Sequence, residues 1–80
     1  MTQVILQYIQ NNLLEEDDIE LTADEDLLSS GLLDSMAMMR LIGFIEERFE
    51  TKIPPEDLVI EHFITVSEME KYLQGAGVKD

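Results

Sequence analysis

Residues 35–50 read SMAMMRLIGFIEERFE, and they carry the strongest helix signal in the chain. When successive residues are placed about 100° apart, its larger apolar side chains fall within an arc of roughly 100° on one helical face. These side chains are Met38, Leu41, Ile42, Ile45 and Phe49. Asp34 precedes the stretch, and its carboxylate can accept a hydrogen bond from a first-turn amide. We therefore predict an amphipathic helix over 35–50 with Asp34 as its N-cap.

An earlier helix is predicted over residues 2–14, where apolar side chains recur at i, i+3 and i+4 spacings. One stripe of this helix consists of Ile5, Ile9 and Leu13. The acids at 15–18 oppose the dipole of a helix C-terminus, so we expect them to end it.

The connection between these two helices, residues 15–34, is long for a compact domain. Its scattered apolar residues should pin it to the core, and they are Ile19, Leu21, Leu27, Leu28, Leu32 and Leu33. The alternative is a further short helix at 24–28.

Beyond Pro54 and Pro55, residues 56–61 predict one or two helical turns, with Pro55 at a tolerated first-turn position. Thr65 and Glu68 then form the pattern of a capping box, with the threonine as N-cap. That last helix should run to about Leu73, and the glycines at 75 and 77 should end it. Its expected core residues are Val66, Met69, Tyr72 and Leu73.

No stretch shows the sustained alternation of a strand or a hairpin dipeptide. We therefore expect one all-α domain over residues 1–80. Its architecture should be a small four-helix bundle, with three main helices, one short helix and a long loop between the first two.

The chain is strongly acidic, with 18 Asp plus Glu against 5 Lys plus Arg and a net charge of −13. Without a basic patch we expect no nucleic-acid partner. Residues 1–39 carry nine acids and no Lys or Arg, so a basic partner surface and solubility alone both remain open explanations. The hydrophobic fraction of 45% nevertheless favours a packed core over disorder.

Several site classes are disfavoured by composition. The chain has no cysteine and one histidine, and its acidic loop lacks the ligand spacing of a calcium-binding loop, so we expect no metal site. The apolar runs are too short to cross a membrane, and the N-terminus lacks the pattern of a signal peptide. We therefore expect a cytoplasmic protein without membrane insertion.

Ser35 is the main candidate for chemistry. It opens the best-predicted helix, at the positive end of the helix dipole, where a phosphate is favoured. A purely structural reading, in which Asp34 and Ser35 only cap the helix, remains open. A hydrolytic role needs a general base, but the only imidazole is His62 and no G-x-S-x-G elbow is present. We expect no catalytic residue, and Ser35 fits better as a substrate of another enzyme.

The outer face of the 35–50 helix carries Met36, Arg40, Gly43 and Glu47 within a narrow arc, with Phe44 on its flank. Methionine adapts to varied partner surfaces, although Met36 could also fold back onto the loop. The residues predicted to bind partners are Met36, Ala37, Arg40, Gly43, Phe44 and Glu47.

Residues 31–36, GLLDSM, resemble the attachment motif of acyl and peptidyl carrier proteins. The resemblance extends to FIEERF at 44–49, TKIP at 51–54 and FITV at 63–66, and it covers essentially the whole chain. It implies that a phosphopantetheinyl transferase attaches 4′-phosphopantetheine covalently to Ser35. It also implies that Asp34 takes part in recognition by the transferase and that Met36 contacts partner enzymes.

The resemblance further implies a thioester arm for an acyl or aminoacyl cargo, loaded by an adenylating ligase or acyltransferase and passed to synthases or transferases. Fatty-acid carriers usually have acids where this chain has Ala37 and Arg40. A monomeric, free-standing carrier of a specialised polyketide or nonribosomal-peptide pathway is therefore expected. The alternatives are a D-alanyl carrier, a fatty-acid carrier, or an acidic helical interaction module with no prosthetic group.

Overall fold

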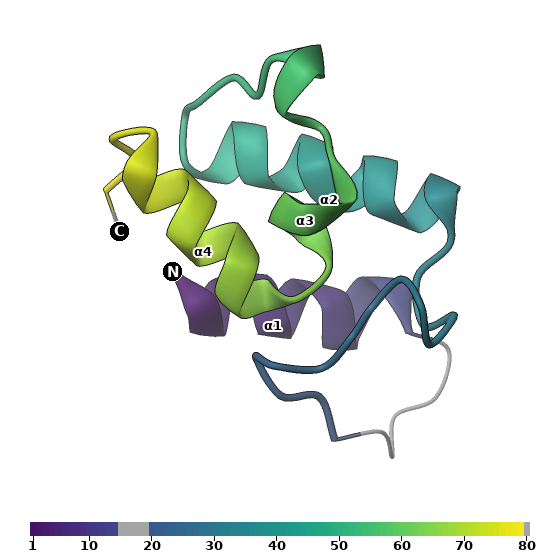
Figure 1. Cartoon of the computed structure of the whole chain (residues 1–80). Helices are drawn as coiled ribbons and strands as arrows, with labels where there is room; N and C mark the ends of the chain where they lie inside the picture. Colours follow the sequence, from purple (N-terminus) through teal and green to yellow (C-terminus); the bar gives the residue numbers. More distant parts are fainter. Residues whose placement is uncertain (15–19, 80) are drawn as a thin grey trace.

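The computed structural model describes residues 1–14 and 20–79. The acids at 15–18 and Ile19, for which the sequence predicted roles, lie outside the described residues. The elements run in the order α1 Thr2–Tyr8, η1 Ile9–Leu13, α2 Ser35–Arg48, η2 Pro55–Asp57, α3 Ile60–Phe63 and α4 Val66–Gly75. Four α-helices and no strand occur in these residues, which confirms the predicted all-α bundle (Figure 1).

The predicted first helix is present but changes its winding. The α-helical turns of α1 continue without a break into η1, which is a π-helical turn. Leu14 then adopts an extended conformation and ends the helix within one residue of the predicted boundary. Ile5 and Ile9 are fully buried, whereas Leu13 is half-buried at the fraying end of the predicted stripe.

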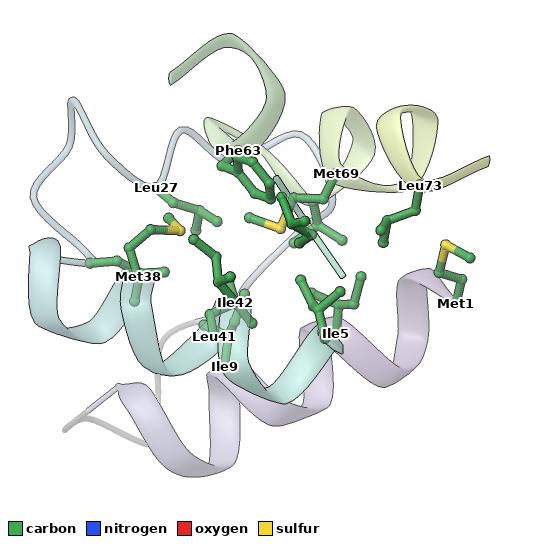
Figure 2. Close-up of a cluster of buried hydrophobic side chains, with 14 residues drawn as sticks. Met1, Ile5, Ile9, Leu27, Met38, Leu41, Ile42, Phe63, Met69 and Leu73 are labelled. Carbon is green, nitrogen blue, oxygen red and sulfur yellow. The ribbon is translucent and has the colours of Figure 1, made fainter. Parts of the chain in front are cut away.

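Buried apolar side chains from every α-helix and from the long loop meet in one cluster (Figure 2). None of the buried residues in the described part of the chain is polar or charged. In α2 the buried residues are Met38, Leu41, Ile42 and Ile45, as the periodicity predicted. Burial of these side chains supplies the main driving force for a domain of this size.

The end of α2 differs from the prediction, because the helix stops at Arg48 rather than at residue 50. Glu50 has a positive φ of 52°, and the amide of Thr51 donates to the carbonyl of Glu46 at 3.0 Å, which is the long bond of a Schellman cap. Phe49 is the C-cap residue of α2 and is half-buried against the core, with Arg48 lying 5.3 Å from its ring centroid.

The long loop is pinned to the core as predicted, and the alternative helix at 24–28 is wrong. Leu27 is fully buried, and its amide donates to the carbonyl of Ile64 at 2.8 Å. The carboxylate of Asp26 accepts from the amides of Leu28 and Ser29 at 3.1 and 2.7 Å. These bonds to a side chain and to a distant carbonyl replace the bonds that a helix would need.

The segment after Pro54 forms two short helices instead of the single one predicted over 56–61. Pro55 opens η2 as expected, but Val59 is extended, with φ −114° and ψ 152°, and becomes the N-cap of α3. The last helix begins as predicted, since the hydroxyl of Thr65 accepts from the amide of Glu68 at 3.0 Å. It ends at Gly75, two residues later than expected, and Gly77 supplies the left-handed residue of its cap with φ 87°.

Candidate attachment and docking site

Ser35 is the first residue of α2, and its side chain is exposed. Asp34 before it is extended, with φ −90° and ψ −177°, and its carboxylate accepts a hydrogen bond from the amide of Ala37 at 2.8 Å. The carbonyl of Asp34 accepts from the amide of Met38 at 2.9 Å. The predicted N-cap is therefore confirmed, and it fixes the serine hydroxyl at the mouth of the helix.

The chain that leads to Ser35 is anchored two residues earlier. Leu33 is only 2% exposed, and its amide donates to the carbonyl of Leu27 at 3.0 Å. Gly31 has a φ of 81°, a left-handed conformation that a side chain would strain. The turn lies between half-buried Leu28 and buried Leu33, with the amide of Gly31 donating to the carbonyl of Leu28 at 3.2 Å, and Ser35 beyond it is exposed.

The helix mouth suits an anion. The amide of Ala37 donates to the Asp34 carboxylate, and that of Met38 makes the first backbone hydrogen bond of the helix. The amides of Ser35 and Met36 come before this bond and have no acceptor within the helix. No acidic residue lies in the first turn of α2. These amides and the helix dipole favour a phosphodiester on the Ser35 oxygen, so the residues present fit an attached phosphate group.

An apolar groove of about 260 Å³ lies between α2 and the segment that enters α3. Ser35 is its only hydroxyl-bearing residue, and the other lining residues are Leu28, Met38, Met39, Ile42, Leu58, Val59, Ile60 and Phe63. Ile60 is 66% exposed and Met39 is 61% exposed, so the groove has an apolar rim on both sides. The sequence reasoning missed this rim, although the apolar run at 58–60 was a signal that could have been used.

The predicted partner face divides into two parts. Arg40, Gly43 and Glu47 are exposed, and Met36 is 75% exposed, so Met36 does not fold back onto the loop. Ala37 and Phe44 are half-buried and pack against the core. The ring of Phe44 also stacks on Tyr8 of α1, with centroids 4.0 Å apart and an angle of 12°, which covers one ring face. A Cβ at Gly43 would meet nothing within 4 Å, so no internal packing in the described structure requires a glycine there.

His62 lies away from Ser35. Its ring is 4.7 Å from that of Tyr72 and 6.4 Å from that of Phe63, centroid to centroid, and it does not line the groove beside the serine.

The hydroxyl of Tyr72 donates to a carboxylate oxygen of Asp57 at 2.7 Å. Burial and this carboxylate raise the pKa of Tyr72 to about 12.

The described residues contain neither a cluster of metal-ligating side chains nor a membrane-spanning helix. No three side chains among His, Cys, Asp and Glu are grouped so that they could hold a metal ion there. Within the same residues, no helix has the length and apolar character needed to cross a membrane.

Comparison with known families identifies the chain. Residues 3–73 match the family described as the phosphopantetheine attachment site. The chain belongs to this family. Such a domain is the site of covalent 4′-phosphopantetheine attachment, and carriers of this kind deliver cargo to partner enzymes such as ligases and transferases in biosynthesis. Proteins of this family are generally not catalysts.

The similar proteins are themselves carriers or parts of biosynthetic proteins. The D-alanyl carrier protein of Streptococcus suis (strain 98HAH33) is 36% identical over 67 residues, which cover 84% of this chain and 82% of that protein. The lincomycin biosynthesis protein LmbN of Streptomyces lincolnensis is 53% identical over 49 residues, which are 61% of this chain but only 18% of LmbN. The chain therefore matches a small part of that longer protein.

Among solved structures, a chain in the crystal structure of a FAD-dependent dehydrogenase is similar, with a TM-score of 0.78 and 32% identity. The match covers 86% of this chain and 97% of that chain. It supports the same helical arrangement around the same core.

Proposed function

We propose that Ser35 is the attachment residue and that the chain is a monomeric cytoplasmic carrier, one domain over residues 1–80, which catalyses no reaction itself. The observation that carries this proposal is the exposed Ser35 hydroxyl at the mouth of α2, with Asp34 as the cap beside it. The family match supports it, because the attachment site of the family must fall on a reachable hydroxyl.

Attachment requires a transferase and coenzyme A. The Ser35 Oγ forms a bond to the pantetheine-bearing phosphorus of coenzyme A as the pyrophosphate bond breaks. The 3′,5′-adenosine diphosphate leaves, and the hydroxyl proton passes to the transferase or solvent. The amides of Ser35 and Met36 and the helix dipole stabilise the phosphodiester that results. Once attached, the group supplies a thiol that holds an acyl or aminoacyl cargo as a thioester.

The pathway we propose is a specialised one of the polyketide or nonribosomal-peptide type, with an adenylating ligase or acyltransferase as the loading enzyme and synthases or transferases as later partners. Supporting it, the 49 residues shared with LmbN are 53% identical, a higher identity than over the D-alanyl carrier match. The D-alanyl carrier remains the alternative, because its match covers more of the chain. Incubation of the phosphopantetheine-bearing chain with a D-alanine-activating ligase, D-alanine and ATP distinguishes the two, because the alternative requires D-alanyl transfer to the chain and the proposed pathway does not.

The similar chain in a FAD-dependent dehydrogenase structure suggests one class of later partner to test.

Intact mass after incubation with a broad-specificity transferase and coenzyme A tests the proposal. We expect the wild-type chain and Ser29→Ala, the matched control at another exposed serine, to gain one phosphopantetheine group. We expect Ser35→Ala to gain none. No gain by the wild-type chain would favour the interaction module, and a gain by Ser35→Ala would move the attachment elsewhere.

A further inference from the structure

Tyr72 connects α4 to both ends of one wall of the groove beside Ser35. Its hydroxyl donates to Asp57, the last residue of η2, at 2.7 Å. Its ring lies 5.8 Å from the ring of Phe63, the last residue of α3, and 4.7 Å from that of His62. One side chain thus contacts the residues that precede and follow the segment 58–60.

The segment 58–60 is the outer wall of the groove, and it has little support of its own. It leads from η2 into α3, in the green part of the ribbon in Figure 1. Its three apolar residues are 38%, 40% and 66% exposed for Leu58, Val59 and Ile60. The amide of Leu58 donates to Pro55 at 3.1 Å and that of Val59 to Asp57 at 2.9 Å, so these bonds stay inside η2 and its exit.

The opposite wall is much firmer. Met38 and Ile42 belong to α2, and both are buried in the main core. Phe63, which is 3% exposed, closes the groove floor and is held by the same core. The position of the outer wall relative to Ser35 therefore depends on how firmly Asp57 is held, since Phe63 already fixes the other end.

We propose that Tyr72 is a positioning residue, whose hydroxyl holds Asp57 and thereby keeps the wall 58–60 in the position that a partner enzyme meets when it approaches Ser35. The role rests on the proposed function, because it concerns access to the attachment serine. Tyr72 does not line the groove and does not touch Ser35, so it acts through the wall alone. Its loss should weaken recognition of the chain and leave the chemistry at the serine hydroxyl unchanged.

The phenol of Tyr72 is protonated at neutral pH and can donate, as any tyrosine is with a pKa near 10, and burial with Asp57 raises its pKa further, to about 12. Asp57 needs only an acceptor oxygen for this bond, and an asparagine in its place retains one. The two residues therefore allow matched variants. Tyr72→Phe removes the donor and keeps the ring, Asp57→Ala removes the acceptor, and Asp57→Asn keeps an acceptor while removing the charge.

The first measurement needs no modification of Ser35. Backbone amide hydrogen exchange of the unmodified chain should accelerate about 2- to 10-fold at Leu58 and Val59, whose amides are hydrogen-bonded, in Tyr72→Phe and in Asp57→Ala. This is the range expected for one hydrogen bond. The amide of Ile5 in α1 should exchange as in the wild-type chain. Asp57→Asn should stay near wild type, and the double variant Tyr72→Phe with Asp57→Ala should go no further than either single one.

The second measurement is the steady-state kinetics of the transferase with each variant. We expect Tyr72→Phe and Asp57→Ala to raise the KM for the chain about 2- to 10-fold with kcat within about twofold, and Asp57→Asn to restore the wild-type KM. Unchanged exchange at the wall, or additive effects in the double variant, would overturn the connection between Tyr72 and the wall. Faster exchange with an unchanged KM would overturn its role in recognition. Failure of the wild-type chain to be modified would overturn the proposed function instead, while the exchange data would still test the connection.

Discussion

The carboxylate of Asp34 accepts a hydrogen bond from the backbone amide of Ala37 at 2.8 Å, and this bond sets Ser35 as the first residue of α2. The residue that caps the helix thus also determines where the Ser35 hydroxyl lies. A cap of this kind is local, since its two partners are three residues apart. This N-cap could therefore be predicted from the local sequence, without knowledge of any tertiary contact.

Replacing Asp34 separates its capping role from its charge. Asp34→Ala should lower the free energy of unfolding by about 1 kcal/mol through loss of the cap. Asp34→Asn retains a side-chain oxygen that can accept from Ala37, so its stability should stay close to that of the wild-type chain. Urea unfolding followed by far-ultraviolet circular dichroism measures both. Equal stability of Asp34→Ala and the wild-type chain would contradict the cap.

Two truncations of α2 side chains should differ in how much folding stability they remove. Ile45 is fully buried, so Ile45→Ala should cost about 2–5 kcal/mol and can unfold a domain of this size. Phe49 is half-buried at the end of the helix, so Phe49→Ala should cost clearly less. Chemical unfolding of the two variants under one condition checks the order. A larger loss of unfolding free energy in Phe49→Ala than in Ile45→Ala would contradict the half-buried position of the Phe49 ring.

Substitutions on the exposed side of α2 should slow the transfer of cargo to the chain and leave the fold intact. Under the proposed function, Met36→Ala should slow transfer of cargo to the chain by its loading enzyme at least about fivefold, because truncation of an important interface side chain costs more than about 1 kcal/mol. Arg40→Glu should also reduce loading, while both variants keep the wild-type helical signal. Gln3→Ala, an exposed change on α1, is the control. Unfolding of Met36→Ala would show that this face assignment is wrong.

The raised pKa of Tyr72 predicts that the stability of the fold falls with pH in the alkaline range. Its pKa rises from 10.0 to about 12 on folding, so the folded chain holds this proton more tightly than the unfolded chain. The stability that it contributes is complete below pH 10.0 and is lost as the pH rises through about 12. In a Tyr8→Phe background, the phenolate absorbance should titrate near 12 and should move toward 10.0 in Asp57→Ala. An unchanged titration midpoint of Tyr72 in Asp57→Ala would contradict the contribution of the Asp57 carboxylate to the raised pKa.

Local chemistry explains which parts of the fold were predictable. The caps at Asp34 and Thr65 and the buried stripe of α2 depend on residues within one or two helical turns of one another. The sequence therefore predicted them correctly. The left-handed Glu50 was not predicted, because a non-glycine residue in that conformation gives no compositional signal.

Long-range contacts explain what was missed. The bond from Leu27 to Ile64 holds the loop to the start of α4, and no pattern within residues 15–34 indicates it. The groove beside Ser35 combines α2 with the segment 58–60, whose apolar residues show no helical period. The bond between Tyr72 and Asp57 joins residues fifteen positions apart, and it explains why the predicted core residue Tyr72 is only half-buried.

The position of the added group is the most direct test of the account. The wild-type chain is modified with coenzyme A and a broad-specificity transferase, digested, and its peptides are fragmented by tandem mass spectrometry. We expect one phosphopantetheine group, located on Ser35. A group on Ser29, Ser30 or Ser67, or an unmodified chain under conditions that modify another carrier, would contradict it.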